Sequence, residues 1–322
     1  MRTALPLAAC VAVHVWSLPA PPLAYADPKA PALKVVGLRT EYKENPLGID
    51  GRKPRLSWRL QSGVRGVTQS AYEVRVAGSE RGVRGGSDSV WSSGRVASDE
   101  SIQRTYEGPP LQSGRRYYWQ VRVWDGTGKA SEWSTPASWE MGLLAPTDWR
   151  ASWIEPALPD DPSQPGPSPL LRRTFKVTGA VDRARAYVTS HGLYELHLNG
   201  RRVGDELFTP GWTSYNKRLQ YQTYDVTPLL KTGDNAVGAV LGNGWYRGNL
   251  AWEDRRNLYG DKLALLAQIH ITYKDGRTET IGTDQAWKAS TGPILMSEIY
   301  HGETYDARLE KAGWTTAGSP GT

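Results

Sequence analysis

The sequence predicts an all-β protein that consists of two β-sandwiches in tandem. Apolar and polar residues alternate with a period of two along many short segments, which is typical of strands with one buried face. Turns rich in glycine, proline and asparagine separate these segments. Almost no stretch has the 3.6-residue period of an amphipathic helix, so neither an α-helical nor a mixed α/β fold is expected.

The first sandwich is expected over residues 34–143. Residues 54–60, 71–76 and 117–125 alternate clearly, and residues 126–128 form a turn after the third of these strands. Strands at this spacing, with turns between them, indicate a fibronectin type III-like β-sandwich. This stretch shows no set of residues typical of a catalytic site, so we expect a spacer or docking role for it.

The two domains are expected to be joined by residues 144–169, a short connector followed by a proline-rich linker. Residues 155–169 contain six prolines together with Asp, Ser, Gly and Gln. A segment this poor in apolar residues buries little surface, so it is predicted to be stiff and exposed. Residues 162–169 are predicted to act as a flexible joint.

The second sandwich is expected over residues 170–318 and is predicted to be a jelly roll. Leu193–Leu198 alternates, and Asn199 and Gly200 provide the two positive-φ positions of a type I′ hairpin turn. Residues 201–208 are then expected to form the returning strand. These features predict antiparallel strands that each bury one face.

A glycine-rich loop follows the buried apolar strand at residues 236–241. In residues 242–248, glycines flank the adjacent aromatic residues Trp245 and Tyr246. The Gly-Asn-Gly sequence is not expected to open a helix, so it does not indicate a nucleotide-binding fingerprint.

The first 26 residues are predicted to be a secretory signal peptide. Arg2 provides a positive charge, residues 4–13 are largely apolar, and residues 24–26 form a small-x-small cleavage site. The apolar run is too short to span a bilayer, so we expect a secreted protein with no membrane association after cleavage. A lipoprotein signal ending at Cys10 is the less favoured alternative. Cleavage would remove this single cysteine, so no disulfide is expected.

The composition favours a carbohydrate-binding surface over a nucleic-acid-binding one. The formal net charge is +6, but the basic residues are spread along the chain, which argues against a nucleic-acid partner. Trp and Tyr number 14 and 16, against 2 Phe. These side chains combine a flat apolar face with a polar group, which suits half-hydrated surfaces on which sugar rings stack. The alternative is that most of them lie in the sandwich cores.

No catalytic residues are predicted. Glycoside hydrolysis requires a pair of carboxylates that flank the scissile bond, and no pattern pairs the acids of this sequence. The sequence also lacks a Gly-x-Ser-x-Gly motif and a phosphate-binding loop. Metal-ligand spacing is absent too, because the histidines after the signal peptide lie far apart: His191, His197, His270 and His301.

Several motifs in a fixed order resemble the N-terminal region of bacterial α-L-rhamnosidases, which are glycoside hydrolases. The motifs are LNG (198–200), PGWTSY (210–215), QTYDVT (222–227), GDNAVG (233–238), GNGWY (242–246), LYGD (258–261) and GETYDAR (302–308). In the first domain, QSAYEVRVA and YYWQVRVWD resemble the module that precedes this region. The resemblance implies that the catalytic acids lie in a helical barrel after it. Because the sequence ends at Thr322, we expect no rhamnosidase activity from these residues alone.

The resemblance also implies a sugar-recognition role and, in some members, binding of L-rhamnose through calcium. Calcium prefers several oxygen ligands from carboxylates, amides and carbonyls. We therefore expect an aromatic platform at Trp245 and Tyr246 with Trp212, Tyr259 or Trp252 nearby, hydroxyl recognition by Asn243, and calcium ligands at Asp205 and Glu206. The alternative for Trp212 and Trp245 is that they pack loops against the sandwich.

Three functions are consistent with the sequence. The favoured one is a secreted, non-catalytic carbohydrate-binding or substrate-recognition region with L-rhamnose-containing glycans or glycosides as partners. The second is a truncated α-L-rhamnosidase that works only with its catalytic domain. The third is an adhesive or assembly module that binds no sugar.

Overall fold

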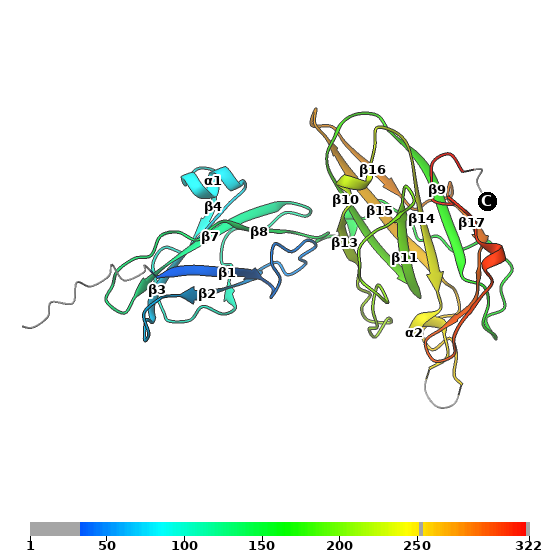
Figure 1. The fold of residues 1–322 in the computed structure, drawn as a ribbon, viewed down its shortest axis with the longest axis horizontal. Coiled ribbons are helices and arrows are strands. Elements are labelled where there is room, and N and C mark those ends of the chain that lie inside the picture. The colour runs from blue at the N-terminus through cyan, green and yellow to red at the C-terminus, as the bar shows by residue number, and fades with distance from the viewer. Residues whose placement is uncertain (1–32, 251–253, 320–322) are drawn as a thin grey trace, which may run out of the picture.

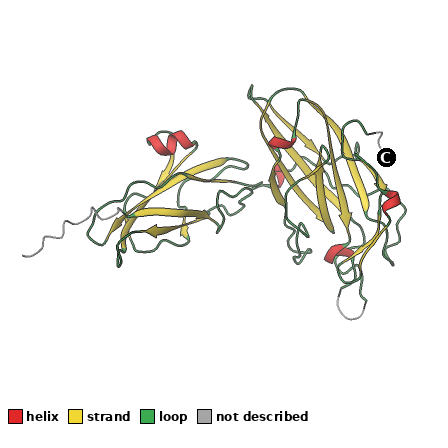
Figure 2. Ribbon diagram, in the orientation of Figure 1, coloured by secondary structure: helices red, strands yellow, loops and turns green. Residues whose placement is uncertain are grey.

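The computed structural model describes residues 33–250 and 254–319. It is nearly all-β, with 43% strand and 7% helix, which confirms the predicted fold class. The two β-sandwiches follow one another along the long axis of the molecule (Figures 1 and 2). The predicted signal peptide and Trp252 lie outside the described residues. Within those residues, no helix is long and apolar enough to cross a membrane.

The first domain packs a three-stranded antiparallel sheet against a second sheet of five strands. The three-stranded sheet has the order β1 (Lys34–Thr40), β2 (Arg55–Gln61) and β6 (Arg104–Thr105). The second sheet contains β4 (Ser89–Ser92), β3 (Gln69–Ala77), β7 (Arg116–Asp125) and β8 (Ala137–Glu140), with β5 (Val96–Ala97) paired to β3. A short helix, α1 (Glu80–Gly85), follows β3. Trp58, Trp119 and Trp139 are fully buried between the sheets.

The second domain packs a four-stranded sheet against a five-stranded one. The first has the order β13 (Gln222–Asp225), β10 (Val181–His191), β15 (Ala264–Tyr273) and β16 (Thr278–Gly282). The second has the order β12 (Arg201–Arg202), β11 (Leu193–Leu198), β14 (Gly233–Gly242), β9 (Pro169–Val177) and β17 (Lys288–Thr291). A separate hairpin joins β18 (Ile294–Glu298) to β19 (Gly302–Tyr305). The described residues also form three 3₁₀ turns, at Pro146–Asp148, Thr227–Leu229 and Ala307–Leu309.

Two of the sequence motifs have a clear structural role in this domain. Asn199 and Gly200 have φ angles of 52° and 81°, which confirms the predicted turn between β11 and β12. The Asn199 side chain donates to Asn235 Oδ1 at 2.7 Å and accepts from the Ala236 N–H at 2.9 Å. Asn235 is fully buried, and its amide also bonds to backbone groups of Lys231. The two asparagines therefore fasten the hairpin to the start of β14.

Two local predictions differ from the structure. The return strand is limited to Arg201–Arg202, because the chain turns away at Gly204, where φ is 76°. The glycine loop does open a helix: Gly244–Arg247 forms one turn, α2. The short turn buries Gly244 against Leu193, where a Cβ would come within 2.5 Å of the leucine side chain. This tertiary contact, and not helix propensity, accounts for the turn.

The connecting segment 144–169 contacts the second domain at several points, while many residues of its proline-rich part are exposed, as the composition predicts. Ile154 exchanges two backbone hydrogen bonds with Leu265 and packs against the core of that domain. Further along, Asp160 pairs with Arg247 at 2.7 Å, and the Pro162 carbonyl accepts from Asn257 Nδ2 at 2.9 Å. A segment can be poor in apolar residues and still be held when its polar groups find partners on a neighbouring surface.

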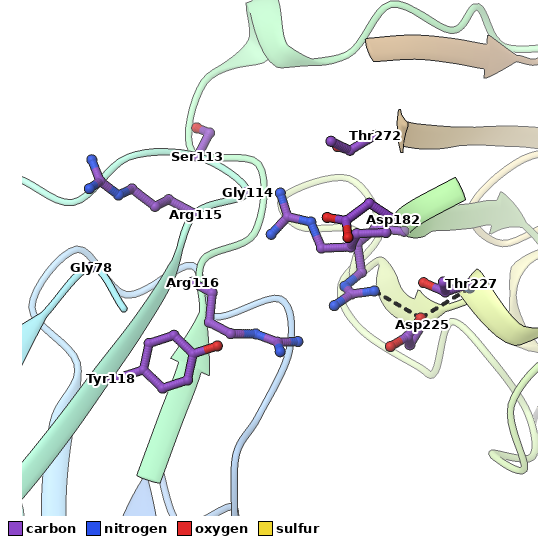
Figure 3. Close-up of a pocket in the computed structure, with 12 residues that line it drawn as sticks. Gly78, Ser113, Gly114, Arg115, Arg116, Tyr118, Asp182, Asp225, Thr227 and Thr272 are labelled. Atoms are coloured by element: carbon purple, nitrogen blue, oxygen red, sulfur yellow. Dashed lines mark hydrogen bonds and ion pairs between the residues drawn. The ribbon is translucent and has the colours of Figure 1, made fainter. Parts of the chain in front are cut away.

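The two domains meet at a buried carboxylate. Glu140, at the end of β8, has no exposed side-chain area, and Arg185 of β10 binds it through two hydrogen bonds of 2.7 and 3.1 Å. Arg116 and Arg183 approach the same carboxylate at 3.2 and 3.6 Å. Arg185 also pairs with Asp225 at 2.8 Å. A cleft of about 650 Å³ between the domains is lined by the three arginines and Asp225, and Figure 3 shows Arg116 extending from the first domain toward Asp225 of the second.

We expect Glu140→Ala to destabilise the protein and loosen the domain contact. Removing the carboxylate leaves the buried guanidinium of Arg185 with only one acidic partner, and breaking a buried pair of this kind costs about 3 kcal/mol or more. Thermal unfolding should shift to lower temperature, and small-angle scattering should show a wider range of domain separations. Glu132→Ala, at an exposed position of the same domain, is the control. Equal unfolding temperatures for the two variants would contradict this role.

Candidate functional site

An exposed aromatic surface, here called the aromatic platform, lies where the loop after β12 meets α2. It consists of Phe208, Trp212, Trp245 and Tyr259. Trp212 and Trp245 stack with ring centroids 5.6 Å apart and planes 7° from parallel, and Phe208 lies 5.8 Å from Trp245. Trp212 Nε1–H donates to Tyr259 Oη at 3.3 Å. Trp212 is 52% exposed, so the stack presents a flat apolar face to solvent.

A second row of rings continues from the platform toward the connecting segment. Tyr215 contacts both Tyr259 and Tyr246 edge-on, at 4.9 and 5.3 Å. His191 stacks between Tyr246, at 4.7 Å, and Trp153, at 4.2 Å. Burial raises the pKa of Tyr215 to about 12 and lowers the pKa of His191. Tyr246 therefore lies behind the platform, where it supports the platform's position.

A hollow of about 200 Å³, here called the platform pocket, adjoins Phe208 on the outer face of β11 and β14. Glu195, Arg202 and Glu206 provide its charged groups. Glu195 Oε1 lies 2.7 Å from His197 Nε2, and its other oxygen lies 3.1 Å from Arg202 Nε. The hydrogen bond with His197 and the charges of His197 and Arg202 lower the pKa of Glu195 despite its partial burial. The pocket thus offers an ionised carboxylate and a guanidinium beside an aromatic face.

The platform rests on a second buried carboxylate, Glu298 at the end of β18. Its side chain has no exposed area and accepts hydrogen bonds from Asn243 Nδ2 at 2.8 Å, the Asn249 N–H at 2.9 Å and Arg256 Nη1 at 2.7 Å. A Cβ on Gly248 would come within 2.5 Å of the same carboxylate, so this position requires glycine. Glu298 thereby holds both ends of α2 and the loop that leads to Tyr259.

The structure brings together three of the residues that the sequence predicts for a sugar site, Trp212, Trp245 and Tyr259. Asn243 is 6% exposed, and its amide donates to Glu298, so it lies beneath the surface. Tyr246 faces His191 in the second aromatic row.

The two predicted calcium ligands, Asp205 and Glu206, are both exposed, and Glu206 lines the platform pocket. Among the described residues, no group of three or more His, Cys, Asp or Glu side chains lies close enough to hold a metal ion. Amide, carbonyl and sugar oxygens, which calcium also binds, are not counted in such a group, so the calcium site at Asp205 and Glu206 stays a prediction.

Sequence reasoning missed several residues of this surface. Phe208 adopts a positive φ of 57° two residues before the PGW motif, and neither its exposure nor its contact with Trp245 is visible from the motif. The strand pattern of β11 does place Glu195 and His197 on the outer face, opposite Leu196. This alternation could have identified Glu195 on the floor of the pocket. The contact of Arg202 with Glu195 depends instead on the short hairpin.

The two domains match known sequence families separately. Residues 179–320 match the profile "Alpha-L-rhamnosidase N-terminal domain", and residues 35–145 match "Rha78A-like, N-terminal immunoglobulin domain". An α-L-rhamnosidase of Streptomyces avermitilis is 32% identical over 89% of the chain, and one of Formosa agariphila is 39% identical over 85%. This chain is an N-terminal region of the α-L-rhamnosidase family. It spans 44% and 30% of the lengths of these two relatives.

Solved structures from the family share the fold of both domains. The structure of the S. avermitilis α-L-rhamnosidase in complex with L-rhamnose superimposes with a TM-score of 0.84, over 89% of this chain and 44% of that one. The native α-L-rhamnosidase of Aspergillus terreus is 40% identical and gives a TM-score of 0.82, over 89% and 33% of the two chains. The immunoglobulin-like domain and the jelly roll therefore occur together in these α-L-rhamnosidases.

His191→Phe is expected to make the protein less sensitive to acid. Because the folded-state pKa of His191 lies below its ordinary value, the unfolded chain binds more protons between those two pKa values. Stability is therefore full above about pH 6.5 and falls as the pH drops below that value. Phenylalanine keeps the stack with Trp153 and Tyr246 but does not titrate.

The measurement is the loss of melting temperature between pH 7.5 and pH 5.5, which should be smaller in His191→Phe than in wild type. The loss of melting temperature should still be present in His191→Phe, since burial also lowers the pKa of His270. Val64→Ala, at an exposed position that does not titrate, is the control and should show the same loss as wild type. An equal loss in wild type and His191→Phe would contradict the assignment.

Proposed function

We propose that this region recognises carbohydrate for an α-L-rhamnosidase, and that the aromatic platform with the platform pocket is the binding site. The observation that carries the proposal is the parallel stack of the exposed Trp212 on Trp245, which Phe208 joins to a pocket whose charged groups are Glu195, Arg202 and Glu206. A pyranose ring has one apolar face, which an indole can cover, and a rim of hydroxyls, which carboxylates and guanidinium groups can bind.

L-Rhamnose and rhamnose-containing glycosides are the proposed ligands. The family relatives are α-L-rhamnosidases, and one of them has a structure with L-rhamnose bound. Rhamnose is a 6-deoxy sugar, and its methyl group adds apolar surface that suits an aromatic contact. The sugar is proposed to bind through direct hydrogen bonds or through a calcium ion at the exposed Asp205 and Glu206, with sugar and backbone oxygens among its other ligands.

The proposed role is binding, not catalysis. A glycosidase needs a carboxylic acid that stays protonated to donate to the leaving group. Glu195, the best-placed acid of the platform pocket, has a lowered pKa because of its partners His197 and Arg202, so it stays ionised at neutral pH. Export through the predicted signal peptide is part of the same proposal, because a recognition region for external glycans has to reach them.

Trp212→Ala is expected to weaken binding of methyl α-L-rhamnoside. Shallow, hydrated sugar sites bind weakly, so a Kd of about 0.1–1 mM is expected for wild type, or about 4–5.5 kcal/mol. Removing one stacked ring should cost about 1 kcal/mol, which corresponds to about a fivefold rise in Kd. Isothermal calorimetry, with and without EDTA, measures both the affinity and any calcium requirement.

Tyr42→Ala is the control, because Tyr42 is 56% exposed and lies in the first domain. It should leave the Kd unchanged, and circular dichroism should show that both variants fold. Undiminished binding by a folded Trp212→Ala would place the sugar elsewhere. Failure of wild type to bind the sugar would favour the assembly-module alternative.

A further inference from the structure

The platform pocket continues into a second hollow along the outer face of the five-stranded sheet. This second hollow measures about 370 Å³ and shares four lining residues with the first: Ser168, Glu195, Val240 and Ile294. Because they share these residues, the two hollows are neighbours on the outer face of the sheet, and together they are here called the sheet groove. It begins at Phe208 on the platform and ends at Trp314.

The floor of the sheet groove is longer than a single sugar ring. Leu193, Glu195 and His197 alternate on the outer face of β11 and line successive parts of it. A strand rises about 3.4 Å per residue, so the path from Leu193 to His197 covers about 14 Å. A monosaccharide on the platform would leave most of this length empty.

The far end of the groove, like the platform end, has aromatic side chains next to a carboxylate. Trp314 packs against β14 at Gly238, where a Cβ would come within 2.5 Å of the indole, and its ring centre is 5.8 Å from that of His197. Tyr305, 49% exposed, donates to Glu310 Oε1 at 2.8 Å. Both ends of the groove thus combine an aromatic face with a carboxylate.

The groove suits a neutral, hydroxyl-rich chain better than a peptide or a polyanion. Its charges nearly balance, with Glu195, Glu206 and Glu310 against Arg202 and Lys311. An extended peptide would bind by adding to a sheet edge, whereas β14 is paired on both sides. The other edge of β11 is covered by β12 and by backbone hydrogen bonds from Tyr194 to Thr209 and from Val203 to Leu196. Side chains alone face the groove, and these side chains suit hydroxyl groups.

We propose that the sheet groove binds a linear oligosaccharide. Its rhamnose unit stacks on the platform, Glu195 and Arg202 bind hydroxyls of the next unit, and a further unit reaches Tyr305 and Trp314. This inference rests on the proposed function, which it extends from one sugar to the chain that carries it. Recognition of a chain would select polymeric or branched substrates over small glycosides.

The test compares methyl α-L-rhamnoside with a trisaccharide that carries a terminal α-L-rhamnose, by calorimetry on the same chain. Wild type should bind the trisaccharide at least about fivefold more tightly, because each added hydrogen bond contributes about 1 kcal/mol. Ala312→Trp, at an exposed position lining the far end, should abolish this advantage and leave the affinity for methyl α-L-rhamnoside unchanged. Glu195→Gln should also weaken trisaccharide binding.

Ala286→Trp is the matched control, since it adds the same indole at an exposed turn outside the groove. It should not affect either ligand. If the trisaccharide binds no more tightly than the monosaccharide, or if Ala312→Trp and Ala286→Trp behave alike, the sheet groove is not a chain-binding site and the platform proposal stands. If neither ligand binds wild type, both proposals fail.

Discussion

A buried carboxylate is stable only when donors surround it, and this constraint acts twice in the molecule. Glu140 requires Arg116, Arg183 and Arg185, and these arginines come from both domains, so satisfying its charge brings the domains together. Glu298 requires Asn243 and the backbone of the following loop, so satisfying it holds α2 in place. The domain contact and the candidate site both depend on charges that cannot be left unpaired.

The parts of the fold that the sequence predicts well are those with local causes. Alternation along Leu193–Leu198 requires a half-buried strand, and Asn199 with Gly200 allows only a tight turn, so the hairpin follows from neighbouring residues alone. The same holds for the long strands β7 and β15. Their inward faces are buried almost completely, which matches the alternation seen in the sequence.

The parts that the sequence did not predict depend on partners distant along the chain. Asn243 looks like an exposed loop amide until Glu298, far along the chain, is placed beside it. Many of residues 155–169 are exposed, as their composition predicts, but the composition does not reveal Arg247 and Asn257, which bind them. The sheet groove likewise requires knowing that residues 292–314 return across the outer face of β14.

The distribution of tryptophan argues that the surface of the second domain was shaped for binding. In the first domain Trp58, Trp119 and Trp139 fill the core, which is the ordinary use of a large side chain. Among the described residues of the second domain, the buried core contains aliphatic side chains, tyrosines and Phe175, and Trp287 packs against it from a partly buried position. Trp212 and Trp245 lie at one end of the groove and Trp314 at the other. Exposing apolar rings costs solvation free energy, so a fold that keeps them at the surface gains most if a ligand covers them.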